Sequence, residues 1–163
     1  VFHSAFQEAF GKPADTRTKF IIWKLGNPAG EISLNFDEVH TEHIMPQTLS
    51  DEWFTVLEKS SGLDRDGVKK THDNLVNKIG NLALINGEWN ISMSNRQFSE
   101  KVDYYRNSEI GPTKELAIKT EWVFDDIIDR TKKLADKAIQ IWEFSKPIPE
   151  ADLSAENLRF GRR

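Results

Sequence analysis

The sequence contains no cysteine among its 163 residues. This absence excludes disulfide bonds, thiolate zinc sites and cysteine nucleophiles, and it is compatible with a reducing compartment. The chain also lacks an apolar run of about 18 residues and a secretory signal peptide, so we expect a cytoplasmic protein that does not enter a membrane. Any metal ion would have to be held by oxygen and nitrogen ligands.

Positive charge is also scarce, since the net charge at pH 7 is −4. This balance argues mildly against nucleic acid as a partner, because phosphate contacts need lysine and arginine. A content of 38% hydrophobic and 29% charged residues, with five tryptophans, is typical of a folded domain with a sizeable core. Because the sequence begins at Val1 rather than at a methionine, we expect a fragment of a longer protein.

The spacing of apolar residues predicts an α+β fold that is mostly helical, with a small two-stranded sheet. Pro46 marks the end of the first predicted strand. Gly80 and Gly87 lie on either side of the second. We expect strands at 39–44 and 81–85, helices at 51–59, 64–78 and 120–144, a polar connection at 86–95, and a helix opened by a capping box from Ser94 to Gln97. The predicted domain spans 1–144, with a helical lead-in at 1–30, a ββα core at about 38–106, C-terminal helices at 113–144, and a tail or linker at 145–163.

The stretch VHTEHIMPQ, residues 39–47, gathers two histidines and a glutamate at the end of the first predicted strand. A histidine with a pKa near 6.5 can take a proton from water, whereas carboxylate and amide oxygens suit a hard cation such as Mg²⁺. Glu42 and His43 can supply these groups, with further ligands from Asn86, Asn90 or Asn95 after the second strand. This combination predicts phosphodiester hydrolysis assisted by a divalent cation.

Strand geometry limits how Glu42 and His43 can share a site. Adjacent side chains in a regular strand point to opposite faces, so the pair cannot face one ion from an ideal strand. Pro46 indicates that the strand already fails near Glu42, and a bulge or loop there would bring both side chains together. The alternative is a site formed by His40 and Glu42, which share a face. We favour the adjacent pair.

The motifs on either side of the predicted helices resemble a known family. TEHIMPQ, followed later by IGNLALINGEWNISMSNRQFSEK, is similar to the ββα-metal core of the HNH, or His-Me finger, endonucleases. Within that group the chain most resembles the C-terminal nuclease domain of GmrSD-type, modification-dependent restriction enzymes. The resemblance covers roughly 21–142 and rests on acidic-His-Ile-x-Pro, Gly-Asn-Leu, an asparagine nine residues further on, and then Ser-Asn and Lys.

This resemblance implies a metal-dependent DNA endonuclease or nickase with His43 as the general base. It implies Glu42 and Asn90 as metal ligands, and Asn81 as the asparagine that braces the histidine loop. An asparagine replaces the last histidine of many members, and the amide oxygen favours Mg²⁺ or Mn²⁺ over Zn²⁺. The residues expected near nucleic acid are His40, Asn95, Arg96 and Lys101.

The resemblance further implies the cleavage part of a restriction or phage-defence protein, with an N-terminal recognition or NTPase domain outside this fragment. An alternative is a nuclease-derived module that binds nucleic acid or a partner protein without cutting, and RNA is an alternative substrate. Two side chains also have a plain structural interpretation: His72 as a helix residue, and Asn81 as a residue that satisfies turn backbone.

Overall fold

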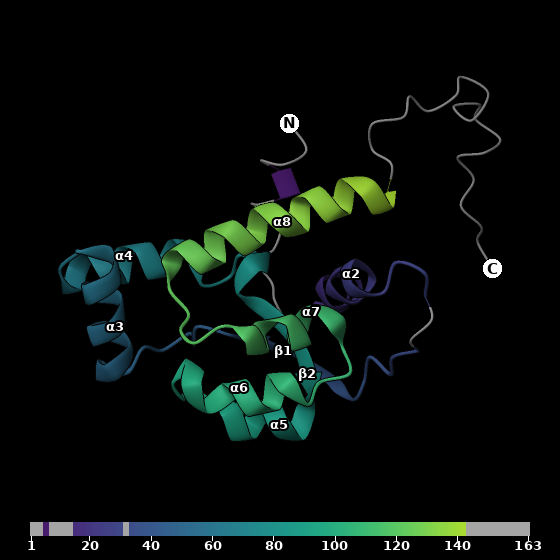
Figure 1. The fold of residues 1–163 in the computed structure, drawn as a ribbon, viewed down its shortest axis with the longest axis horizontal. Coiled ribbons are helices and arrows are strands. Elements are labelled where there is room, and N and C mark those ends of the chain that lie inside the picture. Colours follow the sequence, from purple (N-terminus) through teal and green to yellow (C-terminus); the bar gives the residue numbers. More distant parts are fainter. Residues whose placement is uncertain (1–4, 7–14, 31–32, 143–163) are drawn as a thin grey trace.

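The computed structural model describes residues 5–6, 15–30 and 33–142 (Figure 1). Within these ranges a two-stranded antiparallel sheet, β1·β2, is embedded among helices, which confirms the predicted α+β class. In the described ranges, no helix combines the length and hydrophobicity needed to cross a membrane. The elements in chain order are α2 (Thr16–Gly26), β1 (Val39–His43), α3 (Asp51–Ser61), α4 (Arg65–Leu75), η1 (Ile79–Asn81), β2 (Leu82–Asn86), α5 (Gly87–Met93), α6 (Phe98–Arg106), α7 (Gly111–Lys114), η2 (Glu115–Ile118) and α8 (Phe124–Trp142).

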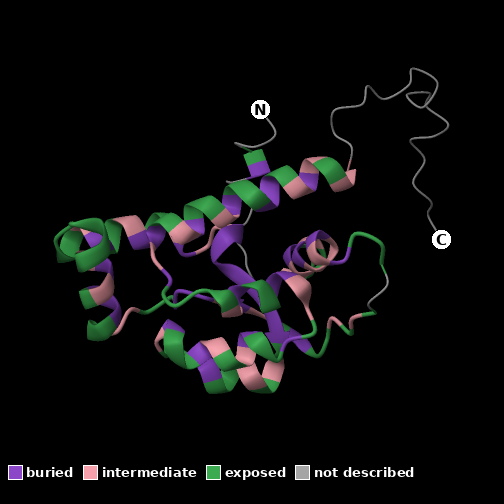
Figure 2. Cartoon of the chain, in the orientation of Figure 1, coloured by how far each residue is buried: buried purple, intermediate pink, exposed green. Residues whose placement is uncertain are grey.

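The strand β2 is buried on both faces, because helices cover the sheet from two sides (Figures 1 and 2). Side chains alternate along a strand, so Leu82 and Leu84 pack into one apolar cluster with α2 and α8, whereas Ala83 and Ile85 pack into another with α3 and α6. Figure 2 shows β2 as buried over most of its length. Packing on both faces therefore fixes β2, and β1 is held to it by pairing up to the candidate site.

The ladder between the strands is regular to the last residue of β1. Val39 pairs with Asn86, Glu42 with Ala83 and His43 with Leu82. The predicted bulge or strand end at Glu42 is therefore wrong. The peptide N–H of Ile44 still donates to the Asn81 carbonyl at 2.9 Å, so the chain leaves the sheet only after His43.

Several predicted boundaries are confirmed and others are corrected. The Ser50 hydroxyl caps α3 by accepting from the Trp53 amide at 3.4 Å. The predicted polar connection at 86–95 is wrong over α5, and the predicted capping box is displaced by one turn, since Gln97 and Glu100 form it. Ser94 instead ends α5 with a φ of 39°. The predicted tail at 145–163 lies outside the described residues, as does most of the first half of the predicted helical lead-in at 1–30.

Gly80 does not end a helix as a C-cap residue, because α4 already ends at Leu75. It lies in η1, against α8, where its amide donates to the Thr131 hydroxyl at 3.1 Å. A Cβ at this position would lie 2.2 Å from the Ile127 carbonyl oxygen and 2.3 Å from Thr131 Oγ1. The glycine is therefore required by the close approach of η1 and α8.

Replacing Gly80 with alanine should lower the free energy of unfolding by about 1–3 kcal/mol, because backbone must move to accept the methyl group. Urea denaturation followed by circular dichroism measures this change. Gly111→Ala is the matched control, since a Cβ there meets only the Gly26 carbonyl at 3.5 Å. Equal midpoints for the two variants would contradict the close-approach explanation.

Candidate active site at the end of the first strand

Four of the residues singled out from the sequence line one pocket: Glu42, His43, Asn90 and Asn95. The first two come from the end of β1, and the other two come from α5 and the turn that follows it. No bulge is needed to bring the pair together, because the pocket lies at the end of the strand. The remaining lining residues are Thr41, Pro46, Gln47 and Ser94.

His43 is half-buried, and its ring contacts the side chain of Asn77 with Nε2 3.0 Å from Oδ1. Burial lowers the pKa of His43 below its usual value, and the charges of Lys101 and His72 lower it further, whereas the bond to Asn77 acts in the opposite direction. The imidazole is therefore neutral at neutral pH, the form in which it can accept a proton. Asn77 was not singled out from the sequence, because it belongs to none of the motifs that carry the resemblance.

Glu42 is only 4% exposed, and its Oε1 pairs with Lys101 Nζ at 2.6 Å. Burial raises the pKa of Glu42, and the charge and hydrogen bond of Lys101 oppose that rise. Lys101 itself has no exposed surface, and its Nζ also donates to the carbonyls of His43 and Ile44 at 3.0 and 3.2 Å. Burial lowers the pKa of this lysine, and its partner Glu42 counteracts the effect.

The expected place of Lys101 beside phosphate is thus corrected, since its ammonium group points inward to the end of β1. The sequence contained a signal for this. Lys101 follows Phe98 by three residues and precedes Tyr105 by four, so all three share one face of α6, and both aromatic residues are buried. A lysine on the apolar face of a helix indicates a buried ionic partner.

Asn81 is completely buried, and each of its polar atoms is paired. Its Nδ2 donates to the carbonyls of Met45 and Val76 at 2.8 and 2.9 Å, and its Oδ1 accepts from the Met45 amide at 2.8 Å and from Trp122 Nε1 at 3.1 Å. The side chain thus ties the loop after His43 to the end of α4 and to the core. Because it does not line the pocket, Asn81 can act only by positioning other residues.

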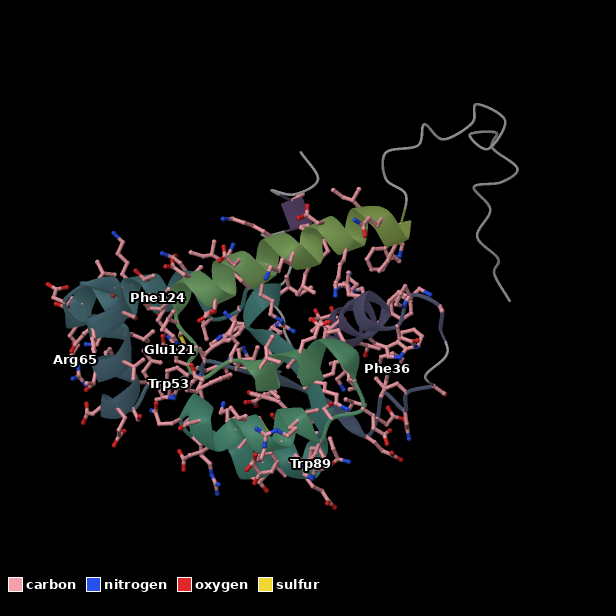
Figure 3. All side chains as sticks on the ribbon, in the orientation of Figure 1. Phe36, Trp53, Arg65, Trp89, Glu121 and Phe124 are labelled. Carbon is pink, nitrogen blue, oxygen red and sulfur yellow. The ribbon has the colours of Figure 1, made fainter. Side chains whose placement is uncertain are left out.

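The other candidates lie around this pocket rather than in it. His40 is exposed, with its Nε2 beside Gly87 at the start of α5, and it does not line the pocket. Arg96 is exposed, and its carbonyl accepts from Nε1 of Trp53, which Figure 3 labels. His72 is buried and donates from Nε2 to the Pro46 carbonyl at 2.8 Å, in agreement with a structural role.

The oxygen donors of the pocket fit a hard divalent cation better than zinc. They include one carboxylate, from Glu42. The others are the amides of Gln47, Asn90 and Asn95 and the hydroxyls of Thr41 and Ser94. Within the described residues, no three His, Cys, Asp or Glu side chains are close enough together to hold a metal ion. Mg²⁺ is compatible with so few charged ligands, because it usually keeps several of its waters.

A histidine and a carboxylate thus lie at the end of a two-stranded antiparallel sheet, and an amide from the next helix lines the same pocket. The chain belongs to the family of GmrSD restriction endonucleases, C-terminal domain, whose family model matches residues 2–137. This match confirms the resemblance deduced from the motifs. It is consistent with nuclease activity and implies DNA as the substrate. No curated protein matches the chain.

Proposed function

We propose that this chain is a metal-dependent DNA endonuclease or nickase domain that hydrolyses phosphodiester bonds. The observation that carries the proposal is the convergence of His43, Glu42 and Asn90 on one pocket. In this proposal the domain is the cleavage part of a larger restriction or phage-defence protein. Recognition of the DNA and any nucleotide-driven switch then belong to another domain.

His43 would act as the general base. Its neutral ring accepts a proton from a water molecule in the pocket, and the water oxygen then forms a bond to phosphorus while the bond to the 3′ oxygen breaks. The lowered pKa of His43 supports this role, because a protonated ring could not accept the proton. Half-burial of the ring also limits the directions from which water can approach.

Glu42 and Asn90 would hold Mg²⁺ or Mn²⁺ between the strand end and α5. When bound, such a cation neutralises charge that develops on the phosphate and on the leaving 3′ oxygen. Lys101 holds the Glu42 carboxylate in a fixed position at the wall of the pocket. A fixed carboxylate loses less conformational entropy when it binds the cation. The exposed Asn95 and Arg96 are proposed to contact the DNA near the scissile phosphate.

A metal titration tests the proposal. Supercoiled plasmid incubated with the chain should give nicked or linear product with Mg²⁺ or Mn²⁺, and no product when EDTA is present. Asn90→Ala should raise the Mn²⁺ concentration needed for half-maximal cleavage by about 10-fold or more, because a ligand is lost. Asn74→Ala is the matched control, since Asn74 is an exposed asparagine on α4.

The same assay separates cleavage from binding alone. A module that binds nucleic acid without cutting would retard the plasmid on a gel without nicking it at any Mg²⁺ or Mn²⁺ concentration. That result would contradict the proposed nuclease activity. Cleavage of single-stranded RNA but not of plasmid would contradict the choice of DNA as the substrate.

A further inference from the structure

We propose that Asn77 is a positioning residue that fixes the ring orientation and the tautomer of His43, so that Nδ1 is the nitrogen that receives the proton from water. The inference deepens the proposed function and rests on it. Its basis is the contact of 3.0 Å between Asn77 Oδ1 and His43 Nε2. An amide oxygen can only accept a hydrogen bond, so the hydrogen of the neutral imidazole resides on Nε2. Nδ1 is then left with a free lone pair.

The backbone on both sides of Asn77 is held in place, which makes the side chain a fixed reference for the ring. The Val76 amide donates to the His72 carbonyl at 2.8 Å, and the Lys78 amide donates to the Leu75 carbonyl at 2.9 Å. The Val76 carbonyl in turn accepts from Asn81 Nδ2 at 2.9 Å. Asn77 therefore lies in the segment that Asn81 connects to the loop after β1.

Three side chains of one segment contact the four residues that begin at His43. Asn77 contacts the ring of His43, Asn81 bonds both polar backbone atoms of Met45, and His72 donates to the Pro46 carbonyl. Two of these contacts fix backbone, and only the contact from Asn77 fixes the imidazole itself. This difference assigns Asn77 a role in orienting the base that the other two residues do not have.

A hydrogen bond to the far nitrogen matters because a free imidazole can carry its hydrogen on either nitrogen. Without an acceptor at Nε2, the ring can adopt the other tautomer or rotate, and in both cases Nδ1 no longer accepts a proton at the required place. The amide is also neutral, so it orients the ring without the strong rise in pKa that a carboxylate would cause. Asn77 therefore orients the ring without adding a charge to the site.

The test combines a tautomer measurement with kinetics, both on the 163-residue chain. Long-range ¹H–¹⁵N correlation spectra at pH 8 should show His43 with its hydrogen on Nε2, and Asn77→Ala should give a mixture or the other tautomer. With plasmid and Mg²⁺ or Mn²⁺, Asn77→Ala should lower kcat by about 10- to 100-fold with little change in KM, because the loss is in orientation and not in DNA binding. Asn77→Asp keeps an acceptor oxygen and should retain the Nε2 hydrogen, but its charge should raise the pKa of His43 and move the pH profile of kcat to higher pH, so that kcat recovers above that pKa.

Asn74→Ala, one turn earlier on an exposed position of α4, is the control and should change neither measurement. The inference is overturned if His43 carries its hydrogen on Nδ1 in the wild-type chain, or if Asn77→Ala keeps both the wild-type tautomer and the wild-type kcat. A variant that alters the tautomer but not kcat also overturns the role in catalysis. If His43→Ala then cleaves as fast as wild type, the failure lies in the proposed function, whereas an inactive His43→Ala places it in the role given to Asn77.

Discussion

His43→Ala is expected to abolish detectable cleavage of plasmid DNA and to leave the fold intact. Removing a general base costs about 10²- to 10⁴-fold in rate, and no other histidine of the described residues lines the pocket to replace it. His72 is buried with its Nε2 already bonded to the Pro46 carbonyl, and His40 lies outside the pocket. The nicking rate measured under single-turnover conditions gives the size of the loss.

Two controls accompany this variant. His40→Ala removes an exposed imidazole from the same strand and should cleave at close to the wild-type rate. The thermal unfolding of His43→Ala should stay close to that of the wild-type chain, because the half-buried ring has one side-chain hydrogen bond, to Asn77, worth about 1 kcal/mol. Nicking by His43→Ala at the wild-type rate would disprove the assignment of the base.

Lys101→Met is expected to cost about 3–5 kcal/mol of the free energy of unfolding, because it leaves Glu42 as an uncompensated charge in the interior. The carbonyls of His43 and Ile44 would also lose a donor. Urea denaturation measures the change through the midpoint and the slope. Lys69→Met, an exposed lysine on α4, is the control and should leave the midpoint nearly unchanged.

A double variant tests whether the effect comes from the pair. Glu42→Met combined with Lys101→Met removes both charges of this buried pair, so the chain should recover most of the stability lost in Lys101→Met alone. A Lys101→Met chain with wild-type stability would show that the pair is not held as the structure has it. Equal stability of the single and the double variant would show that loss of packing, and not the unpaired carboxylate, causes the effect.

Local patterns in the sequence determined much of the fold. Pro46 and the apolar run before Asn86 located the two strands to within a residue or two, and Ser50 correctly marked the start of α3. The short helix α5 was missed, because the sequence predicted a polar connection at 86–95. The Asn86 side chain caps that helix by accepting from the Glu88 amide at 2.9 Å. The bulge expected at Glu42 was wrong, because β2 offers a pairing partner all the way to His43.

The sequence by itself determined the two-stranded α+β fold, the family, and the presence of His43 and Glu42 at a strand end. These depend on apolar spacing and on the residue types of motifs, which the sequence displays directly. Tertiary structure alone decided that Asn77 orients the ring and that Lys101 turns inward to Glu42, over separations of 34 and 59 residues. The physical reason is that Asn77, in the segment after α4, and Lys101, on α6, are brought to the end of β1 by the packing of the chain, which sets both the partners and the burial of the two groups. Burial then shifts the pKa of His43 downward and that of Glu42 upward, which neither residue type nor spacing encodes.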